Sequence, residues 1–244
     1  MKKLILLFSL FSLISYNGKC QDTLKATAKR ISSELNINPL NGSFSFNNAN
    51  AQIKIRKFTS DHKALRLAIT TTYLQNNSSS KSNYGYDPIK QSIYQRSLTT
   101  ALNIGMEKHL NGTRRISPYI GWELGFAIKS SKEIDKDGGI KTTIDGTWWT
   151  RQAYYDGYYH YTQVTFNERG FWSVGANIVA GIDFYVAKDF YFGVEIAYGL
   201  DYYKYSKIDV SSNDSYGDTY PKLDSNKWSF GPKLLNGIRI GFVF

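Results

Sequence analysis

The amino-acid sequence predicts an all-β protein: a closed, antiparallel, eight-stranded transmembrane β-barrel whose strands follow one another as an up-and-down meander. Three observations lead to this fold class. Apolar and polar residues alternate along eight segments of the chain. Long and short connections between these segments take turns. The glycines of the later segments gather on their polar face, where the lumen of a narrow barrel needs small residues.

The composition limits the class of protein before any single segment is considered. The chain has 244 residues, of which 42% are hydrophobic and 16% aromatic, too many aromatics for a disordered chain. Its mean hydropathy of -0.38 excludes a bundle of membrane-spanning helices, whereas alternating strands average out near neutral. The single cysteine, Cys20, excludes a disulfide framework and a zinc site built from cysteines.

Residues 1–20 have the pattern of a secretory signal peptide. Two lysines precede an apolar stretch at residues 4–14, which is too short to cross a bilayer as a helix. Gly18 and Cys20 are the small residues expected before a cleavage site, although lipidation of Cys20 is an alternative. We expect residues 21–30 to form a short periplasmic segment and residues 31–244 to form the barrel.

The first three predicted strands have short alternations. Their ranges are residues 31–40, 51–58 and 65–74. In chain order their apolar faces carry Ile31, Leu35 and Ile37, then Ile53 and Ile55, then alternate residues of a threonine-rich segment. The opposite faces carry charges, among them Glu34, Lys54, Arg56 and Arg66. The alternation is weakest in the first two of these segments.

The five later strands alternate more clearly and are long enough to cross a membrane at a tilt. They are predicted at residues 93–107, 116–129, 171–186, 190–205 and 228–244. Their bulky faces include Leu102 and Met106, then Trp122 and Leu124, then Val174 and Ile178, then Val194 and Ile196, and finally Phe230 and Ile240. Pro232 has no N–H to donate to a ladder, so we expect it near the outer rim or at a bulge.

The connections between these strands alternate in length. Residues 59–63, 109–115 and 187–189 are short connections, and residues 41–50, 75–92, 130–170 and 206–227 are long ones. Outer-membrane barrels have short periplasmic turns and longer outer loops. The order therefore fits a barrel that begins and ends on the periplasmic side.

The glycines indicate which face meets the lipid. A soluble barrel would bury the apolar face, and an outer-membrane barrel would turn it outward. All ten interior glycines of the five later strands lie on the polar face: Gly105, Gly121, Gly125, Gly175, Gly181, Gly193, Gly199, Gly231, Gly237 and Gly241. Glycine weakens a water-facing strand, but it makes room for long side chains inside a narrow lumen. The bulky face is therefore predicted to face lipid.

Charged residues also lie on the predicted lumen face, with six acids and six bases in near balance. They are Glu34, Glu107, Glu123, Asp183, Glu195 and Asp201, and Lys54, Arg56, Arg66, Lys129, Lys233 and Arg239. An unpaired charge in such a lumen costs on the order of several kcal/mol. We therefore expect a salt-bridge network formed by Glu123, Asp183, Glu195, Arg56, Arg66 and Arg239. This network is either a plug that locks the barrel or a path for ions or protons, and eight strands leave little room for a path.

The chain resembles the small eight-stranded outer-membrane barrels, such as the OmpA membrane domain and OmpX, most sharply in its last residues, GIRIGFVF. The resemblance implies a monomeric barrel in the outer membrane of a Gram-negative cell, with membrane lipid around it. It also implies that Phe242 and Phe244 belong to a C-terminal signal read by the outer-membrane assembly machinery.

A cluster of aromatic residues marks the longest outer connection. The residues are Trp148, Trp149, Tyr154, Tyr155, Tyr158, Tyr159 and Tyr161. Tyrosine and tryptophan are frequent in recognition surfaces, so a protein or glycan ligand is one interpretation. An interfacial aromatic belt, or outer strands that pair with each other, is the other interpretation.

Motifs for chemistry are nearly absent, and we expect neither cofactor, metal nor nucleic acid. His62 and His109 fall in predicted periplasmic turns, and His160 lies in the longest outer connection. The net charge of +10 is spread over strands, turns and loops, so it does not form a nucleic-acid surface. The sequence therefore predicts a non-enzymatic cell-surface, structural or accessory barrel protein. A narrow porin-like channel for small solutes is the alternative, and a lipid- or peptide-modifying enzyme that uses His160 is the third.

Overall fold

The protein is all-β and antiparallel. The computed structural model describes residues 24–37, 52–81, 90–155, 160–213, 223–234 and 238–244, and of residues 36–37, 150–155, 160–164 and 234 the backbone alone. The expected signal peptide at residues 1–20 and the lipidation of Cys20 lie outside these ranges. Within them, no helix has the length and apolar character needed to span a bilayer.

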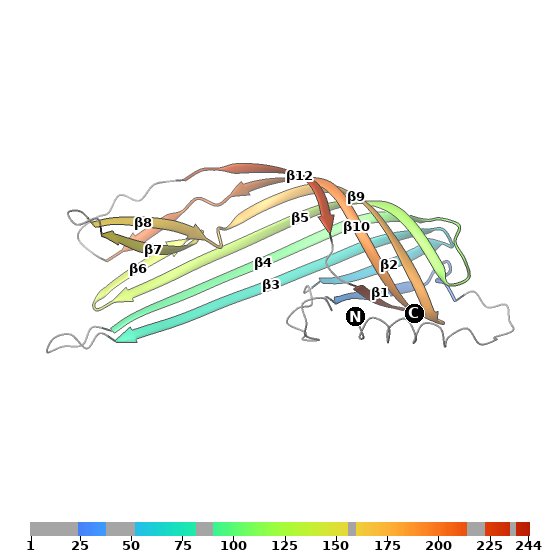
Figure 1. The fold of residues 1–244 in the computed structure, drawn as a ribbon, viewed down its shortest axis with the longest axis horizontal. Coiled ribbons are helices and arrows are strands. Elements are labelled where there is room, and N and C mark those ends of the chain that lie inside the picture. The colour runs from blue at the N-terminus through green and yellow to red at the C-terminus, as the bar shows by residue number, and fades with distance from the viewer. Residues whose placement is uncertain (1–23, 38–51, 82–89, 156–159, 214–222, 235–237) are drawn as a thin grey trace, which may run out of the picture.

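Eight strands form a meander-like ring, which the pairing of the last strand with the first closes, and Figure 1 shows its long strands β3, β4 and β5 side by side. The strands are β1 (Ile31–Ile37), β2 (Gln52–Ser60), β3 (Lys63–Lys81), β4 (Lys90–His109), β5 (Ile116–Asp137), β9 (Phe171–Ala187), β10 (Phe190–Tyr205) and β13 (Ile238–Val243). Each pairs with the next in this order, and β13 pairs with β1. The three predicted short connections are confirmed: residues 61–62, 110–115 and 188–189 join consecutive strands at one end of the ring. We refer to this end as the short-turn end.

The last position of the ring is shared by two strands. Both β12 (Asn226–Leu234) and β13 pair with β10. β12 pairs with residues 196–204 of β10, and β13 pairs with residues 190–193, near the short-turn end. Pro232 of β12 lies opposite Tyr198 of β10. Within the described residues β12 has β10 as its one partner, so Pro232 lies in an edge strand, where proline is tolerated.

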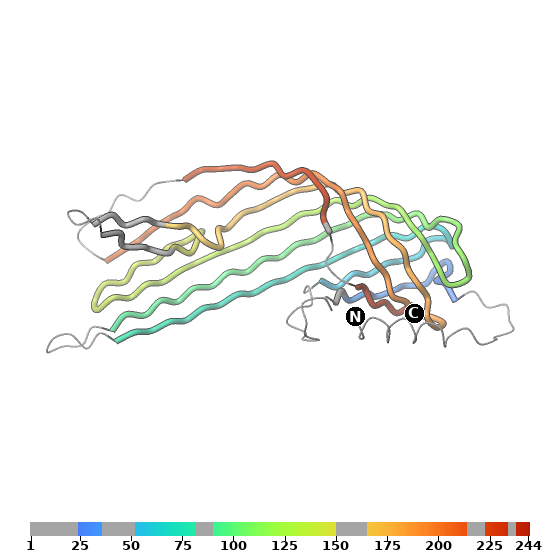
Figure 2. Tube along the Cα trace, in the orientation of Figure 1, coloured from blue at the N-terminus to red at the C-terminus, as the bar shows by residue number. Residues whose placement is uncertain are grey.

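Three strands extend well beyond the apolar segments from which they were predicted. β3, β4 and β5 continue past the predicted limits to Lys81, Lys90 and Asp137. Figure 2 shows them as long tubes that lie side by side. These ends fall within the connections predicted at residues 75–92 and 130–170; residues 75–81, QNNSSSK, for example, are polar on both faces. Alternation reports burial, whereas backbone hydrogen bonds hold these outer extensions together whatever the side chains are.

The long connection predicted at residues 130–170 is also largely strand. β6 (Ile140–Asp145) folds back on β5 and pairs with β11 (Asp209–Ser212). β7 (Trp148–Tyr155) and β8 (His160–Asn167) form a separate hairpin. The interpretation that outer strands pair with each other is therefore correct for the backbone of this region.

The two faces of the ring have opposite character. Trp122, Ile178 and Ile196 point outward and are 48%, 70% and 58% exposed. Glu123 and Glu195, next to two of them in the chain, are only 8% and 5% exposed because they point into the ring. The structure thus agrees with the predicted assignment of bulky residues to the outside and charges to the inside.

Glycines on the inner face make room for aromatic rings as well as for charges. Tyr119 of β5 lies directly opposite Gly181 of β9, and Tyr191 of β10 lies opposite Gly241 of β13. A Cβ atom on either glycine would overlap the phenol ring of its tyrosine. Both tyrosines are buried in the lumen. The ring is too narrow for two large side chains at the same register position, so a glycine opposite each tyrosine leaves space for the phenol.

The segment before β1 covers the short-turn end of the ring. Ala26 is buried there against Phe58, Tyr185 and other apolar residues, with Leu24 packed on the same cluster. The Ala26 N–H donates to the Tyr185 hydroxyl at 3.3 Å, and the Lys29 N–H donates to the Phe58 carbonyl at 2.8 Å. Part of the expected N-terminal segment, residues 21–30, is thus packed on the ring.

Candidate functional site

A cluster of nine charged side chains fills the lumen, and every strand of the ring contributes at least one of them. The cluster consists of Glu34, Lys54, Arg56, Arg66, Glu107, Glu123, Asp183, Glu195 and Arg239, which we call the lumen ion cluster. All nine are buried. Their side chains converge because each occupies an inward position of its strand, and successive strands place these positions at similar heights.

Arg56 connects three strands on the side of the cluster nearest the short-turn end. Its guanidinium lies 2.6 Å from Glu34, 3.0 Å from Glu107 and 2.8 Å from Asp183. Arginine suits this role because its planar fork offers five donors and stays charged. Arg56 also lies 5.1 Å from the centre of the Tyr191 ring, within the range of a cation–π interaction.

Arg66 and Arg239 extend the network across the lumen. Arg66 contacts Glu107 at 2.9 Å, Glu123 at 2.9 Å and Glu195 at 2.8 Å. Arg239 contacts Glu34 at 2.9 Å and Asp183 at 3.1 Å. Each guanidinium therefore joins carboxylates of two or three other strands.

Lys54 and two tyrosines complete the contacts to the carboxylates. The Lys54 ammonium donates to Glu195 at 3.0 Å and lies 3.6 Å from Glu34. The Tyr191 hydroxyl donates to Glu34 at 2.6 Å, and the Tyr119 hydroxyl donates to Glu195. Such charge-assisted bonds offset part of the cost of burying the acids.

The structure brings together all six residues that were named for the salt-bridge network. It adds Glu34, Lys54 and Glu107, which the alternation had already placed on the inward face but which were not assigned to the network. It also adds Tyr119 and Tyr191. The alternation places Tyr119 on the inward face too. The face of a residue does not by itself show which carboxylate on another strand its phenol reaches.

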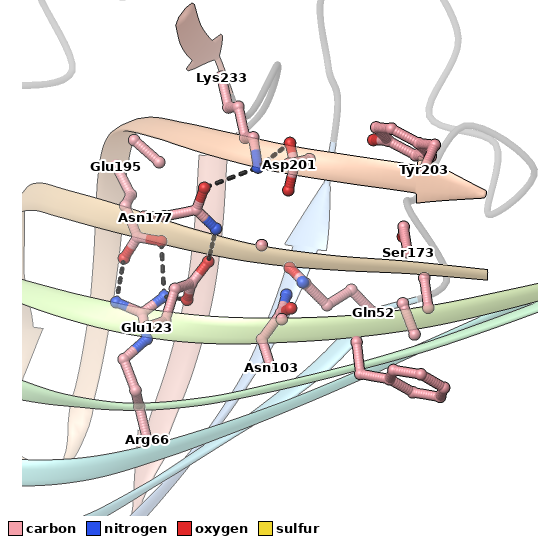
Figure 3. A pocket seen from close by; sticks show the side chains of 16 residues that line it. Gln52, Arg66, Asn103, Glu123, Ser173, Asn177, Glu195, Asp201, Tyr203 and Lys233 are labelled. Carbon is pink, nitrogen blue, oxygen red and sulfur yellow. Dashed lines mark hydrogen bonds and ion pairs between the residues drawn. The ribbon is translucent and has the colours of Figure 1, made fainter. Parts of the chain in front are cut away.

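A cavity of about 190 Å³ lies beside the lumen ion cluster, on the side away from the short-turn end (Figure 3). A chain of polar contacts crosses its wall. Glu123 accepts from Asn177 at 3.2 Å, Asn177 accepts from Lys233 at 2.6 Å, and Lys233 pairs with Asp201 at 2.6 Å. The cavity is therefore polar, and the cluster of Arg66, Glu123 and Glu195 forms one of its walls.

The prediction that His109 lies in a turn is wrong. It is the last residue of β4, and its ring is buried in the lumen because the ladder of β4 extends two residues further than predicted. Its Nδ1 lies 2.9 Å from the Ser117 hydroxyl, and its Nε2 lies 3.4 Å from Glu107. In the part of the chain that the structure describes, no group of three or more His, Cys, Asp or Glu could hold a metal ion.

The tryptophans proposed for outer recognition are buried at the base of the β7–β8 hairpin. Trp148 donates from its indole to the Arg96 carbonyl at 2.8 Å, and Trp149 packs with Ile144 and Ile208. These two residues are core of the outer extension, so they do not offer a recognition surface. Tyr154 and Tyr161 are paired in the hairpin backbone, as are Tyr155 and His160. The side chains of these four residues, and Tyr158 and Tyr159 entirely, lie outside the described part.

The proposed assembly residues lie at the end of the last strand. Phe242 is 52% exposed and Phe244 is 72% exposed, and both project from the outer face. The Phe244 N–H donates to the Ile31 carbonyl at 2.7 Å, so the chain end continues the pairing that closes the ring. The ring of Phe242 lies 4.8 Å from that of Phe190 on the neighbouring strand.

Comparisons with known proteins add one distant likeness. No family model and no curated protein matches the chain. Among solved structures, the crystal structure of the N-terminal β-barrel domain of Pseudomonas aeruginosa OprF is similar at 13% identity, with 90% of this chain and 100% of that chain covered and a TM-score of 0.35.

Proposed function

We propose that the chain is a non-enzymatic, integral outer-membrane β-barrel protein whose lumen is closed by the lumen ion cluster. The observation that carries this proposal is the inversion of its two faces. Large apolar residues cover the outside of the ring, and nine buried charges fill its centre. A protein folded in water buries its apolar side chains and leaves its charges exposed.

Closure of the ring also favours a lipid surrounding. Lipid offers no hydrogen bonds, so a sheet that crosses it cannot leave an open edge. The pairing of β13 with β1, continued by Phe244 and Ile31, joins the first and last strands of the meander. Within the proposal, the exposed Phe242 and Phe244 form the signal for the outer-membrane assembly machinery.

The lumen ion cluster supports a closed barrel over a channel. Arg56, Arg66 and Arg239 each hold carboxylates from several strands, and all three guanidinium groups are buried. Opening a path for ions would break several of these contacts at once and leave charges unpaired at low dielectric. We therefore assign the protein a structural role at the cell surface, or the role of an accessory subunit in an outer-membrane complex.

Planar-bilayer recording of the purified, folded protein tests this proposal. We expect the protein to insert and to show no large, steady conductance, in the wild-type form and in Glu123→Ala. A steady pore in the wild-type protein would replace the closed barrel with the porin-like alternative. Failure of the correctly folded protein to enter lipid vesicles would overturn the membrane assignment itself.

A further inference from the structure

Three lysines lie on the outer face of the ring near its short-turn end. Lys57 of β2, Lys63 of β3 and Lys108 of β4 are all exposed. Their chain neighbours Phe58, Ala64 and His109 are buried inside the ring. Since side chains alternate between faces along a strand, the three ammonium groups belong to the outer face, on which Leu65 and Met106 are also exposed.

Two of these lysines are direct neighbours across the sheet. Lys63 of β3 is paired in register with Lys108 of β4. Residues opposite each other on one face have Cβ atoms about 5 Å apart, and like charges in this position destabilise a sheet. No acidic side chain among the described residues forms an ion pair with Lys57, Lys63 or Lys108. The described residues therefore give the pair no counter-charge.

A groove of about 300 Å³ lies beside the paired lysines on the same face. Its apolar walls come from Met106, Ile120, Trp122 and Ile178, and Lys63 and Lys108 belong to its lining. Met106 and Trp122 are paired in register, one row further from the short-turn end than Lys108 and Ile120. The groove thus has a cationic end toward the short turns and an apolar end toward the middle of the ring.

We propose that this groove binds one anionic phospholipid from the periplasmic leaflet of the outer membrane. The lipid phosphate lies between Lys63 and Lys108, and an acyl chain follows the groove along Met106 and Trp122. Lys57 strengthens the positive field one strand away. The site rests on the proposed membrane insertion, because the short-turn end is the periplasmic end of such a barrel.

The charge and the shape of the site favour a lipid over a free anion. Two adjacent ammonium groups complement a phosphate, and basic residues near a membrane surface attract anionic lipid. Phosphate alone would leave the apolar part of the groove unfilled. An acyl chain fills it and covers Trp122 and Ile178, which are 48% and 70% exposed.

Lipid retention by the folded, full-length protein tests the site. The protein is reconstituted with phosphatidylglycerol and phosphatidylcholine of identical acyl chains, and the lipids that remain bound after transfer to mild detergent are counted by native mass spectrometry. We expect phosphatidylglycerol to be retained in preference, and the Lys63→Gln, Lys108→Gln double variant to lose that preference at least about tenfold.

The other end of the same two strands offers a matched control. Lys81 of β3 and Lys90 of β4 are also paired in register and exposed, and neither lines the groove. The Lys81→Gln, Lys90→Gln double variant is expected to retain phosphatidylglycerol like the wild type. Equal losses in both double variants would overturn the site, because the effect would then follow net charge alone.

A second measurement places the acyl chain. Phosphatidylglycerol with brominated chains is expected to quench tryptophan fluorescence more than brominated phosphatidylcholine does, and Trp122→Phe should abolish this difference. Competition by glycerol phosphate as effective as that by the whole lipid would contradict the groove assignment. A wild-type protein that inserts but shows no lipid preference would overturn this inference alone, whereas one that does not insert would overturn the proposed function.

Discussion

Tyr119 of β5 donates a hydrogen bond to Glu195 of β10 across Gly181 of β9. Gly181 is the register partner of both residues, so the phenol passes over a position of β9 that has no side chain. Three strands are fixed in height by this contact. It also shows why the inner face needs glycine: the ring closes around side chains that reach beyond their own neighbours.

Substitution of Gly181 tests this arrangement. A Cβ atom there would overlap the Tyr119 hydroxyl and approach the Val194 carbonyl, so we expect Gly181→Ala to destabilise the protein by about 1–3 kcal/mol, as overpacking does. The midpoint of urea unfolding in lipid vesicles measures the effect. Gly139→Ala is the control, because a Cβ atom at Gly139 meets nothing within 4 Å. Equal midpoints for the two variants would show that the lumen has spare room at Gly181.

Removal of one cation from the lumen ion cluster should cost far more than removal of a surface cation. Arg56→Met leaves Glu34, Glu107 and Asp183 with fewer partners, and we expect a loss of about 3–5 kcal/mol in the free energy of unfolding. Lys132→Met, which breaks an exposed pair with Asp145, should cost less than about 1 kcal/mol. The same unfolding measurement compares them, and similar costs would mean that the cluster does not lock the ring.

The outward face can be tested with a charge. Ile196 is 58% exposed on β10, and its neighbour Ala197 is buried on the inner side. A lysine on the lipid face of a barrel costs about 2–4 kcal/mol near the middle of the membrane, so Ile196→Lys should be strongly destabilised in vesicles. Ile140→Lys, at an exposed site on the outer extension, is the control and should be near neutral. A neutral Ile196→Lys would indicate water around the ring.

Ser117, His109 and Glu107 are the residue types of a hydrolase triad, but we expect no activity from them. His109 Nε2 is 3.4 Å from Glu107, and that carboxylate is held by Arg56 and Arg66 at 3.0 and 2.9 Å, so His109 lacks a dedicated partner that orients it as a base. A fluorophosphonate probe should therefore leave the folded protein unlabelled. Labelling that disappears in Ser117→Ala would contradict the non-enzymatic assignment.

The sequence predicted the ring and its polarity because both follow from local alternation. Inward placement of Glu123 and Glu195, and outward placement of Trp122 and Ile196, need only a period of two. The partners within the lumen were harder to predict. Lys54 and Glu34 are on the predicted face, yet the contact of Lys54 with Glu195 and that of Glu34 with Tyr191 depend on the relative height of strands that are not neighbours in the ring, which alternation does not report.

The outer extension was missed for a different physical reason. Residues 75–81 are exposed on both faces, and residues 130–137 bury the polar side chains of Ser131 and Glu133, so neither segment carries apolar alternation. Their strands persist through backbone pairing. The burial of the two tryptophans was missed likewise, since Trp149 packs with Ile144 and Ile208 and the Trp148 indole donates to the Arg96 carbonyl. Their position among many tyrosines suggested a recognition surface. Composition alone does not distinguish an aromatic surface from a small aromatic core.

Quenching of a single tryptophan tests the central claim most directly. A variant that keeps Trp122 and replaces the other tryptophans by phenylalanine is folded into vesicles with and without brominated acyl chains. Trp122 is 48% exposed on the outer face, so brominated lipid should quench it strongly and aqueous acrylamide should quench it weakly. Strong acrylamide quenching with no effect of bromine, in a correctly folded protein, would mean that this face meets water.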